Sequence, residues 1–292
     1  MSRNLNIIVT GASGQLGSSF KYLANKYKYK FHFYDKTHFD ITDYFDVEKK
    51  IKKILPKIII NCAAYTDVDK SELNKRKANL INNLAVKNLA EKCYKYKIKL
   101  IHISTDYIFD GKKKSPYKEF DDANPINYYG QTKLKGENQI LNLNLKNSII
   151  IRTSWLYSFS ENNFVSNIIS NLKTKDSIKV VDDKFGSPTN AIDLACLILN
   201  IIPKLNFIES TKIFHFSNSG FCSRFQLAVK INSIIKSKCK IIPITSIELK
   251  TKRPNFSALD STMIEKDYGI SILNWEKRLE NHLNYKNYVN EF

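Results

Sequence analysis

The sequence predicts an α/β protein with a doubly wound parallel sheet and a smaller C-terminal lobe. Over the first 155 residues, short apolar runs alternate with longer amphipathic segments, which is typical of repeated βαβ units with right-handed crossovers. Of the 292 residues, 43% are hydrophobic and 25% are charged. This globular composition provides enough apolar residues for a core and argues against disorder, collagen or coiled coil.

Strands are expected where short runs are rich in β-branched or aromatic residues, at 5–10, 30–34, 57–61, 98–103 and 148–152. Helices are expected where apolar residues recur at helical spacing, at about 15–27, 43–55 and 72–96. Pro56 ends the second of these helices. Leu80, Leu84 and Leu89 are predicted to mark the buried side of the third.

Beyond Trp155 the alternation loosens, and only scattered candidate strands remain. We therefore expect a core of residues 1–155, to which segments at about 176–200 and 212–236 return. Residues 156–292 are predicted to form mainly a second, discontinuous lobe.

The charge balance raises the possibility of a nucleic-acid partner, because 46 Lys and Arg face 28 Asp and Glu, for a net charge of +18. Only six of these cations are Arg, the residue that supplies bidentate contacts to bases and phosphates, and the 40 Lys are scattered. We therefore expect no nucleic-acid partner. A positive field would still favour an acidic small molecule.

Five cysteines occur at 62, 93, 196, 222 and 239, an odd number without a CxxC pair. This argues against a disulfide framework and a structural zinc site. No apolar run is long enough for a signal peptide or a membrane span. We expect a cytoplasmic protein that has no membrane partner.

Three of the nine glycines, Gly11, Gly14 and Gly17, directly follow the first strand and open the first helix. Glycine at such a junction permits a tight turn, close approach of a pyrophosphate and close packing of helix on strand. The helix N-terminus then presents free N–H groups to the phosphates. The pattern predicts a Rossmann-like dinucleotide site. A tight turn that binds no ligand is the alternative.

The choice between NAD and NADP is left open by two neighbouring residues. Asp35 ends the second strand, 21 residues after Gly14, where a carboxylate accepts from a ribose 2′-hydroxyl. Lys36 follows it and would instead face a 2′-phosphate. Small residues, including Ala63 and Ala64, close the third strand, where a flat cofactor ring can pass.

Tyr129 and Lys133 lie four residues apart, so they share one face if the segment is helical. An ammonium beside a phenol favours the phenolate and lowers its pKa, which suits proton exchange. Thr105 follows the fourth strand, at the carboxyl edge where a doubly wound sheet binds its ligand. A solvated helix face is the alternative for the Tyr–Lys pair.

Eight stretches carry a family resemblance: VTGASGQLG at 9–17, DITD at 40–43, NCAAYTDVDK at 61–70, STDYIFDG at 104–111, YGQTK at 129–133, RTSW at 152–155, GSPT at 186–189 and RP at 253–254. Through them the chain resembles the dTDP-4-dehydrorhamnose reductase family of the extended short-chain dehydrogenase/reductase superfamily over essentially its whole length. Related 4,6-dehydratases carry an Asp-Glu pair after the Thr, whereas Asp106-Tyr107 stands here.

The resemblance implies reduction of the C4 keto group of dTDP-4-dehydro-L-rhamnose, with NADPH as cofactor and NADH as the alternative. Tyr129 would protonate the developing alkoxide, and Thr105 would hydrogen-bond the same oxygen. Lys133 would hold the nicotinamide ribose and lower the pKa of Tyr129. The product would enter nucleotide-sugar and cell-surface polysaccharide synthesis, such as the O-antigen of lipopolysaccharide.

The resemblance also implies the binding residues. Those for the cofactor are Gly11, Ser13, Gly14, Gln15, Leu16, Gly17, Asp35, Asp40, Ile41, Ala63, Ala64, Tyr65, Asn82, Tyr129 and Lys133. Those for the substrate are Thr66, Val68, Thr105, Asp106, Tyr107, Trp155, Asn163 and Arg253. A buried core aromatic is the alternative for Trp155, and a plain surface cation is the alternative for Arg253.

Some family members form a dimer bridged by Mg²⁺ through glutamates. The positions that align with such acids hold Ser19 and Ile192, which are poor ligands for a hard cation. We therefore expect no metal, and a monomer or a weak homodimer.

Two other functions remain open from the sequence. One is another nucleotide-sugar 4-keto reductase or an epimerase. The other is a non-catalytic dinucleotide-binding subunit, because the resemblance extends to the β subunit of methionine adenosyltransferase. The intact set of Thr105, Tyr129 and Lys133 argues against the second.

Overall fold

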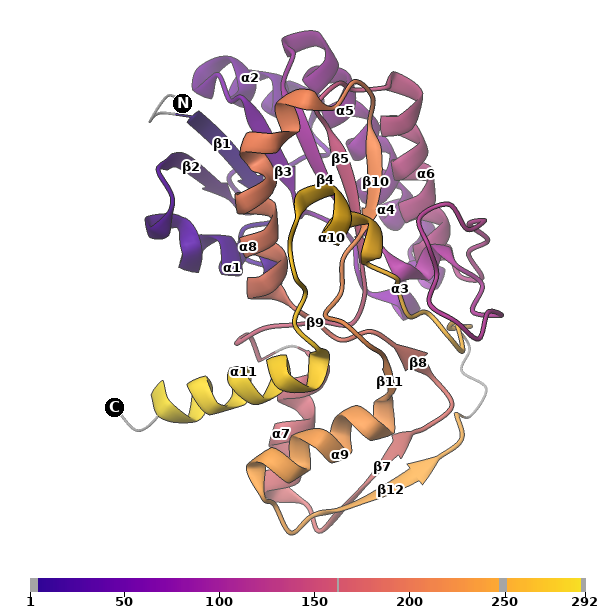
Figure 1. The fold of residues 1–292 in the computed structure, drawn as a ribbon. Coiled ribbons are helices and arrows are strands. Elements are labelled where there is room, and N and C mark those ends of the chain that lie inside the picture. Colours follow the sequence, from indigo (N-terminus) through magenta and orange to yellow (C-terminus); the bar gives the residue numbers. More distant parts are fainter. Residues whose placement is uncertain (1–4, 162, 247–250, 290–292) are drawn as a thin grey trace.

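The computed structural model describes residues 5–161, 163–246 and 251–289. At its centre lies a parallel sheet with strand order β10-β5-β4-β3-β1-β2 (Figure 1). Its strands are β1 (Leu5–Thr10), β2 (Tyr29–Tyr34), β3 (Ile58–Asn61), β4 (Lys99–Thr105), β5 (Ile149–Thr153) and β10 (Lys212–His215). The predicted parallel α/β architecture is confirmed. The chain order reverses beside β1, where β2 lies on one side and β3 on the other.

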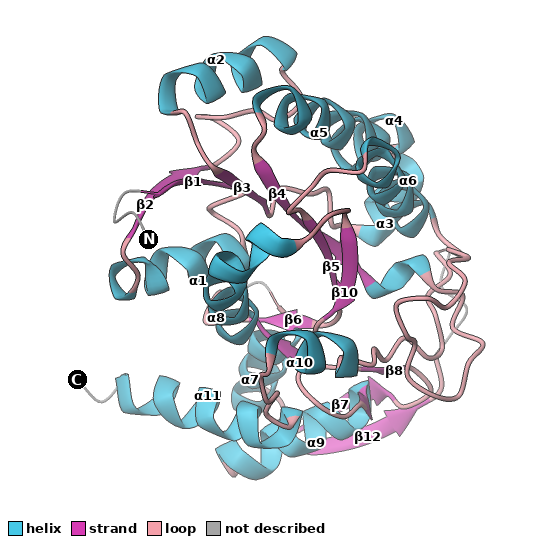
Figure 2. Cartoon of the chain, turned by 45° about the horizontal axis from the view of Figure 1, so that its top comes forward, coloured by secondary structure: helices cyan, strands magenta, loops and turns pink. Residues whose placement is uncertain are grey.

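Alternating side chains bury both faces of this sheet. In β1, Ile7 and Val9 belong to the apolar cluster that includes α1 (Gln15–Leu23) and α8 (Ala191–Ile201). Ile8 belongs to the opposite cluster, under α2 (Tyr44–Ile54), α5 (Ala85–Tyr96) and α6 (Tyr128–Leu143). Figure 2 shows the sheet between these two helical layers. The period of two along the strand therefore produces a doubly covered sheet.

The prediction of one continuous helix over 72–96 is wrong. The segment is divided into α3 (Val68–Leu73), α4 (Lys75–Asn79), a π-helical turn (Leu80–Leu84) and α5. A π turn widens the hydrogen-bond ring by one residue and shifts the phase of the following side chains. Leu80 and Leu84 are therefore exposed, at 39% and 48%, whereas Leu89 is buried as predicted.

Most of the remaining elements build the smaller lobe, which lies below the sheet in Figure 1. Its helices are α7 (Phe164–Thr174), α9 (Arg224–Ile235) and α11 (Trp275–Val289), and β7 (Ser177–Val181) pairs in parallel with β12 (Lys240–Ile244). Short pairs join β6 (Leu156–Tyr157) to β9 (Thr189–Asn190) and β8 (Phe185–Gly186) to β11 (Cys222–Ser223). Helix α10 (Thr262–Tyr268) packs against β10 of the core, and 3-10 turns lie at Ala24–Lys26, Asp106–Ile108 and Ile202–Phe207.

The two segments expected to return to the core are each split by the structure. Helix α8 packs against α1, and β10 pairs with β5, so these parts lie in the core. Strand β7 and helix α9 instead share the apolar cluster of the lobe. The division follows from pairing, because β7 bonds to β12 and not to the central sheet.

None of the described helices combines the length and the apolar character that crossing a bilayer requires.

Candidate active site

The glycine-rich turn after β1 has a shape that larger residues would not allow. Gly11 has a φ of +62°, and a Cβ there would lie 2.7 Å from the backbone nitrogen of Ala63. A Cβ on Gly17 would lie 2.4 Å from the carbonyl oxygen of Gly11. No side chain caps the N-terminus of α1. The free N–H groups of its first turn are thus available to an anion.

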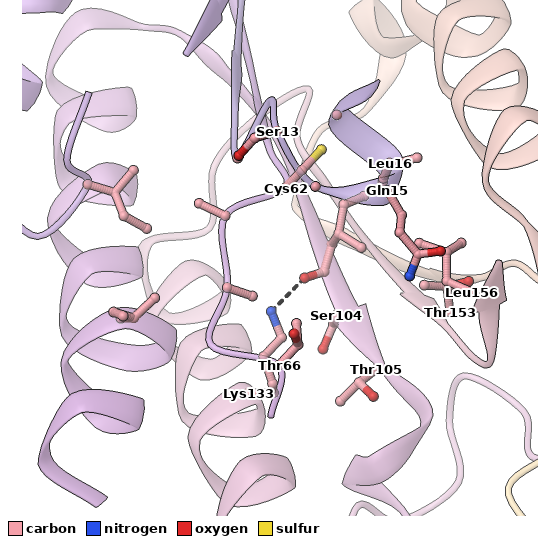
Figure 3. A pocket seen from close by; sticks show the side chains of 18 of the residues that line it. Ser13, Gln15, Leu16, Cys62, Thr66, Ser104, Thr105, Lys133, Thr153 and Leu156 are labelled. Carbon is pink, nitrogen blue, oxygen red and sulfur yellow. Dashed lines mark hydrogen bonds between the residues drawn. The ribbon is translucent and has the colours of Figure 1, made fainter. Parts of the chain in front are cut away.

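A cleft of about 710 Å³ opens at the carboxyl edge of the sheet, beside this turn (Figure 3). It is lined by many of the predicted residues: Gly11, Ser13, Gly14, Gln15, Leu16, Gly17, Asp40, Ile41, Ala63, Ala64, Thr66, Thr105, Asp106, Tyr129, Lys133 and Trp155. Residues from the glycine turn and from the Tyr–Lys motif therefore face one continuous space. A site of this kind at the switch point of a doubly wound sheet is where such folds bind ligands.

The charge at the β2 end of the cleft differs from the prediction. Asp35 does not line the cleft, because its carboxylate accepts hydrogen bonds from Thr37 and His38 in the turn after β2. Hydrogen bonds from His38 and Thr37 lower the pKa of Asp35 to about 2. Lys36 does line the cleft. A cation, and not the expected carboxylate, therefore faces this end.

Tyr129 is placed by the start of α6, where the Asn127 side chain accepts from the N–H of Gly130 at 2.8 Å. A Cβ on Gly130 would lie 2.0 Å from the carbonyl oxygen of Tyr107, so only glycine allows this close packing. The Thr105 hydroxyl donates to Asp106 at 3.1 Å. Burial raises the pKa of the Tyr129 phenol, and its hydrogen bond with Thr105 lowers that pKa only in part.

Lys133 is buried, with 1% of its surface exposed. Its amine donates to the carbonyl oxygen of Ile103 at 2.6 Å, the dashed line in Figure 3, and lies 3.3 Å from Nε2 of His102. Burial lowers the pKa of Lys133 to about 8, against a smaller opposing effect of Glu137. In this structure the amine is directed at β4 and burial dominates the pKa of the Tyr129 phenol, so the lowering of that pKa by Lys133 stays a prediction.

A buried polar chain behind Lys133 was not predicted from the sequence. Oδ1 of Asn61 accepts from Thr10 at 2.7 Å and from the N–H of Ala63 at 3.3 Å. Its Nδ2 lies 3.1 Å from Nδ1 of His102. Burial and the nearby Lys133 charge hold the pKa of His102 well below its usual range, so this ring is neutral. The available signal was a histidine within the apolar run of β4.

Asp106, which lines the cleft, has a buried carboxylate oxygen without a hydrogen-bond partner in the described part of the chain. The residue is 3% exposed, and its Oδ2 has no hydrogen-bond partner among the described residues. Burial raises the pKa of this carboxyl to about 6. A buried acceptor without a partner favours a ligand that brings a hydrogen-bond donor.

Several predicted residues do not line the cleft, and two of them have structural contacts instead. The side-chain oxygen of Asn82 accepts from the N–H of Tyr65 at 2.8 Å, and its side-chain nitrogen donates to the carbonyl oxygen of Tyr65 at 3.0 Å. These two bonds fix the loop after β3. Asn163 caps α7 and donates to the carbonyl oxygens of Ser158 and Ser160. Both N–H groups of its amide are used in these contacts, and the contact of Asn163 with substrate stays a prediction. Tyr65 and Val68 also lie outside the cleft lining.

Arg253 lies on a second cavity, of about 890 Å³, next to the first. It forms an ion pair with Asp69 at 2.8 Å and hydrogen-bonds the Tyr107 hydroxyl. The Tyr107 ring in turn packs edge-on against Tyr129, with ring centroids 5.8 Å apart. The lining of this cavity is basic and aromatic: Lys112, Lys113, Lys114, Lys184, Lys252, Phe185, Phe221 and Phe256.

Trp155 has a φ of +43°, a left-handed conformation that costs energy for a bulky residue. Its ring packs so closely on Gly186 that a Cβ there would lie 2.3 Å from it. The guanidinium of Arg224, which sequence reasoning missed, lies 3.5 Å from the ring centroid. Trp155 is therefore neither a plain core aromatic nor a free stacking surface.

Other lining residues were also missed: Phe39, Thr42, Cys62, Ile81, Ile103, Ser104, Thr153, Ser154, Leu156 and Ser160. Thr153 and Ser154 directly follow the fifth predicted strand, so strand-end position was a usable signal for them. Within the described parts of the chain, no group of three or more His, Cys, Asp or Glu side chains is arranged to hold a metal ion.

Comparison with known proteins gives the family. A family model described as the RmlD substrate binding domain matches residues 5–287. The chain is similar to a dTDP-4-dehydrorhamnose reductase of Aggregatibacter actinomycetemcomitans, at 36% identity over 94% of this chain and 97% of the relative.

Two solved structures extend the similarity to three dimensions. A dTDP-4-dehydrorhamnose reductase from Clostridium acetobutylicum superposes with a TM-score of 0.92 at 38% identity, covering 97% of this chain and 100% of that one. One from Bacillus anthracis, in complex with NADP, gives 0.91 at 36% identity, covering 97% and 99%. The resemblance carried by the sequence motifs is confirmed, and the chain belongs to the dTDP-4-dehydrorhamnose reductase family.

Proposed function

We propose that this protein reduces the C4 keto group of dTDP-4-dehydro-L-rhamnose to dTDP-L-rhamnose, with NADPH as the reductant. The observation that carries the proposal is the meeting of Thr105, Tyr129 and Lys133 with an uncapped glycine turn in one cleft. The activity named for the relatives supports the choice of substrate.

The cleft suits a dinucleotide that carries an additional phosphate. Gly11 and Gly17 permit the tight packing of this turn, and the uncapped N-terminus of α1 offers free N–H groups to a pyrophosphate. Lys36 would hold a 2′-phosphate, whereas the Asp35 carboxylate is hydrogen-bonded within the turn and does not line the cleft. The NADP bound to the Bacillus anthracis relative supports the same preference. When bound, a reduced nicotinamide supplies the hydride.

The protein's own residues would manage the proton. Tyr129 donates its phenolic proton to the sugar oxygen at C4, and Thr105 holds the same oxygen by a hydrogen bond. The raised pKa of Tyr129 keeps it protonated, as an acid must be before the step. Lys133 would bind the nicotinamide ribose, for which its amine must turn from Ile103 towards the cleft.

We assign the nucleotide sugar to the seam between the core and the lobe of residues 156–292. Asp106 would accept from a sugar hydroxyl through its unpartnered oxygen, and Thr66 and Trp155 would border the sugar. Arg253 and the neighbouring lysines would face the phosphates. The basic lining of the second cavity supports this orientation, because the substrate is an anion.

The setting of the reaction is part of the same proposal. We place the protein in the cytoplasm, as a monomer or weak homodimer that supplies a deoxysugar nucleotide to cell-surface polysaccharide such as O-antigen. All five cysteines are free thiols, in keeping with a reducing compartment.

Turnover assays test the function directly. The protein is mixed with NADPH or NADH and a panel of 4-keto-6-deoxy nucleotide sugars, and loss of the reduced cofactor is followed by absorbance. We expect turnover with the dTDP-linked sugar and a preference for NADPH. Turnover only with another nucleotide sugar would move the assignment to a related reductase or epimerase. No turnover with any sugar, together with tight binding to an adenosyltransferase, would overturn the enzyme assignment.

A further inference from the structure

Arg224 is held rigidly at the boundary between the lobe and the core. It is the first residue of α9, and its guanidinium carbon lies 3.5 Å from the Trp155 ring centroid and 4.6 Å from that of Phe164. A guanidinium between two aromatic rings is attracted by both and loses rotamer freedom. The side chain is therefore oriented before any ligand arrives.

This cation lacks the partner that comparable arginines have. Arg152, Arg253 and Arg278 each form an ion pair with a carboxylate at 2.8 or 2.9 Å. No carboxylate of the described chain lies within ion-pair distance of Arg224, although the residue is partly buried. A partly desolvated charge without a directly paired carboxylate is costly, so an anion supplied from outside would stabilise it.

The surrounding charges favour an anionic ligand further. Burial lowers the pKa of Arg224 to about 10, and the nearby positive charge of Arg253 also lowers it, while Tyr107 and Asp106 raise it. The residue remains charged at neutral pH, and two like charges thus converge on one region. Arg224 also stands at the N-terminal end of α9, where the helix dipole adds positive potential.

The position of Arg224 relates it to both cavities. Its ring partner Trp155 lines the catalytic cleft. Its backbone N–H donates to the carbonyl of Lys184, which lines the second cavity together with Arg253. Arg224 itself lines neither cavity, but it contacts a residue of each.

We propose that Arg224 binds the diphosphate of the nucleotide sugar, acting with Arg253 as a two-arginine clamp whose forks are held by Trp155 and Tyr107. This assignment rests on the proposed function, because it takes the substrate to be a nucleoside diphosphate sugar. A planar guanidinium matches the phosphate oxygens in a bidentate manner, and stacking on Trp155 leaves its in-plane N–H donors free. The strained backbone of Trp155 is then explained as the cost of orienting this clamp.

Binding of dTDP to the full chain with NADP⁺ present tests the proposal without turnover. Calorimetry compares dTDP with thymidine for the wild type, Arg224→Met and Arg224→Lys. We expect Arg224→Met to lose about ten- to a hundredfold in dTDP affinity, the effect of one charge-assisted bidentate contact, and to bind thymidine as before. Arg224→Lys keeps the charge but lacks the fork, so its affinity should be intermediate.

A matched control removes the same charge elsewhere. Arg76 is exposed on α4 and, unlike Arg224, does not stack on Trp155 of the cleft, so Arg76→Met should bind dTDP like the wild type. Circular dichroism melting verifies that each variant is folded, and Arg224→Gln replaces Arg224→Met if the methionine variant does not fold.

The outcomes separate this proposal from the proposed function. If Arg224→Met binds dTDP as tightly as the wild type, the clamp is overturned while the function stands. If the wild type prefers UDP or GDP and Arg224→Met loses that affinity, the clamp is supported and the dTDP assignment falls. If the wild type binds none of these nucleoside diphosphates, both are overturned.

Discussion

Burial controls the chemistry of individual residues in this site more than direct charge contacts do. The phenol of Tyr129 has a raised pKa and the amine of Lys133 a lowered one, and desolvation is the main cause of both. The neutral His102 behind Lys133 adds no charge to offset this. Near neutral pH, Tyr129 is thus a protonated acid, and Lys133 is still mostly an ammonium that loses its proton around pH 8.

Replacing Tyr129 with Phe removes the proposed proton donor while preserving the ring that packs on Tyr107. We expect kcat to fall by about 10²–10⁴-fold, the usual contribution of a positioned general acid. Cofactor affinity, measured by fluorescence titration, should remain near the wild-type value. Wild-type turnover in Tyr129→Phe would remove this residue from the mechanism.

The pKa of Lys133 predicts a pH dependence of cofactor capture. Above about pH 8 the free enzyme loses the ammonium that is proposed to hold the nicotinamide ribose. We therefore expect kcat/KM for NADPH to decline through this pH, because kcat/KM reports ionisations of the free enzyme. A profile that stays flat to pH 9.5 or so would contradict this assignment.

The same ionisation has a consequence for stability with a defined sign. The pKa of Lys133 is lowered in the folded state, so between about pH 8 and 10.5 the unfolded chain binds more protons than the folded one. The free energy of unfolding should accordingly rise with pH across this window. Urea unfolding at several pH values gives this free energy for the wild type and for Lys133→Met. We expect the difference, wild type minus variant, to rise with pH across the window, and an identical pH slope in both proteins would disprove the assignment.

At the scale of elements, the sequence predicted the regular parts of the fold better than the irregular ones. Runs of β-branched or aromatic residues located the first five strands to within about two residues. The signal is strongest in β1, β3, β4 and β5, which are mostly buried. The π turn at Leu80–Leu84 left no such signal. Its phase shift depends on how closely α6 approaches, which is a tertiary contact and not a local preference.

Gly136 lies where α6 packs against the π turn, and its substitution tests this close contact. A Cβ there would lie 2.2 Å from the carbonyl oxygen of Asn82 in the π turn. We expect Gly136→Ala to lower the free energy of unfolding by about 1–3 kcal/mol, as overpacking does, although alanine is the better helix former. Urea unfolding measures this, with the exposed neighbour substitution Lys135→Ala as control. An unchanged or higher stability in Gly136→Ala would show that α6 and the π turn can move apart without loss of free energy.

For the whole molecule, the cofactor half of the site could be predicted and the lobe half could not. The glycine turn and the Tyr–Lys motif are local in sequence, and strand-end positions place them at one edge of the sheet. The role of Arg224 depends on how the lobe folds back, since its side chain stacks on a ring 69 positions away. Sequence spacing contains no information on such contacts.

The net charge of +18 predicts long-range electrostatic attraction of an anionic substrate. Long-range attraction depends on the Debye length, which falls from about 30 Å at 0.01 M to about 3 Å at 1 M ionic strength. We expect kcat/KM for the nucleotide sugar to decrease several-fold over this range while kcat changes little. Sucrose at matched osmolality is the control, and a salt-independent kcat/KM would exclude electrostatic capture.

The path of the chain between the two halves also bears on how such a protein can evolve. Because α8 and β10 complete the core after the lobe has begun, no single break in the gene would separate a cofactor module from a substrate module. A truncated product ending near Trp155 would lack one edge strand of the sheet and the helix that packs beside α1. A change in sugar specificity must therefore arise by substitutions and loop changes within this one chain. It cannot arise by exchange of a contiguous substrate-binding domain.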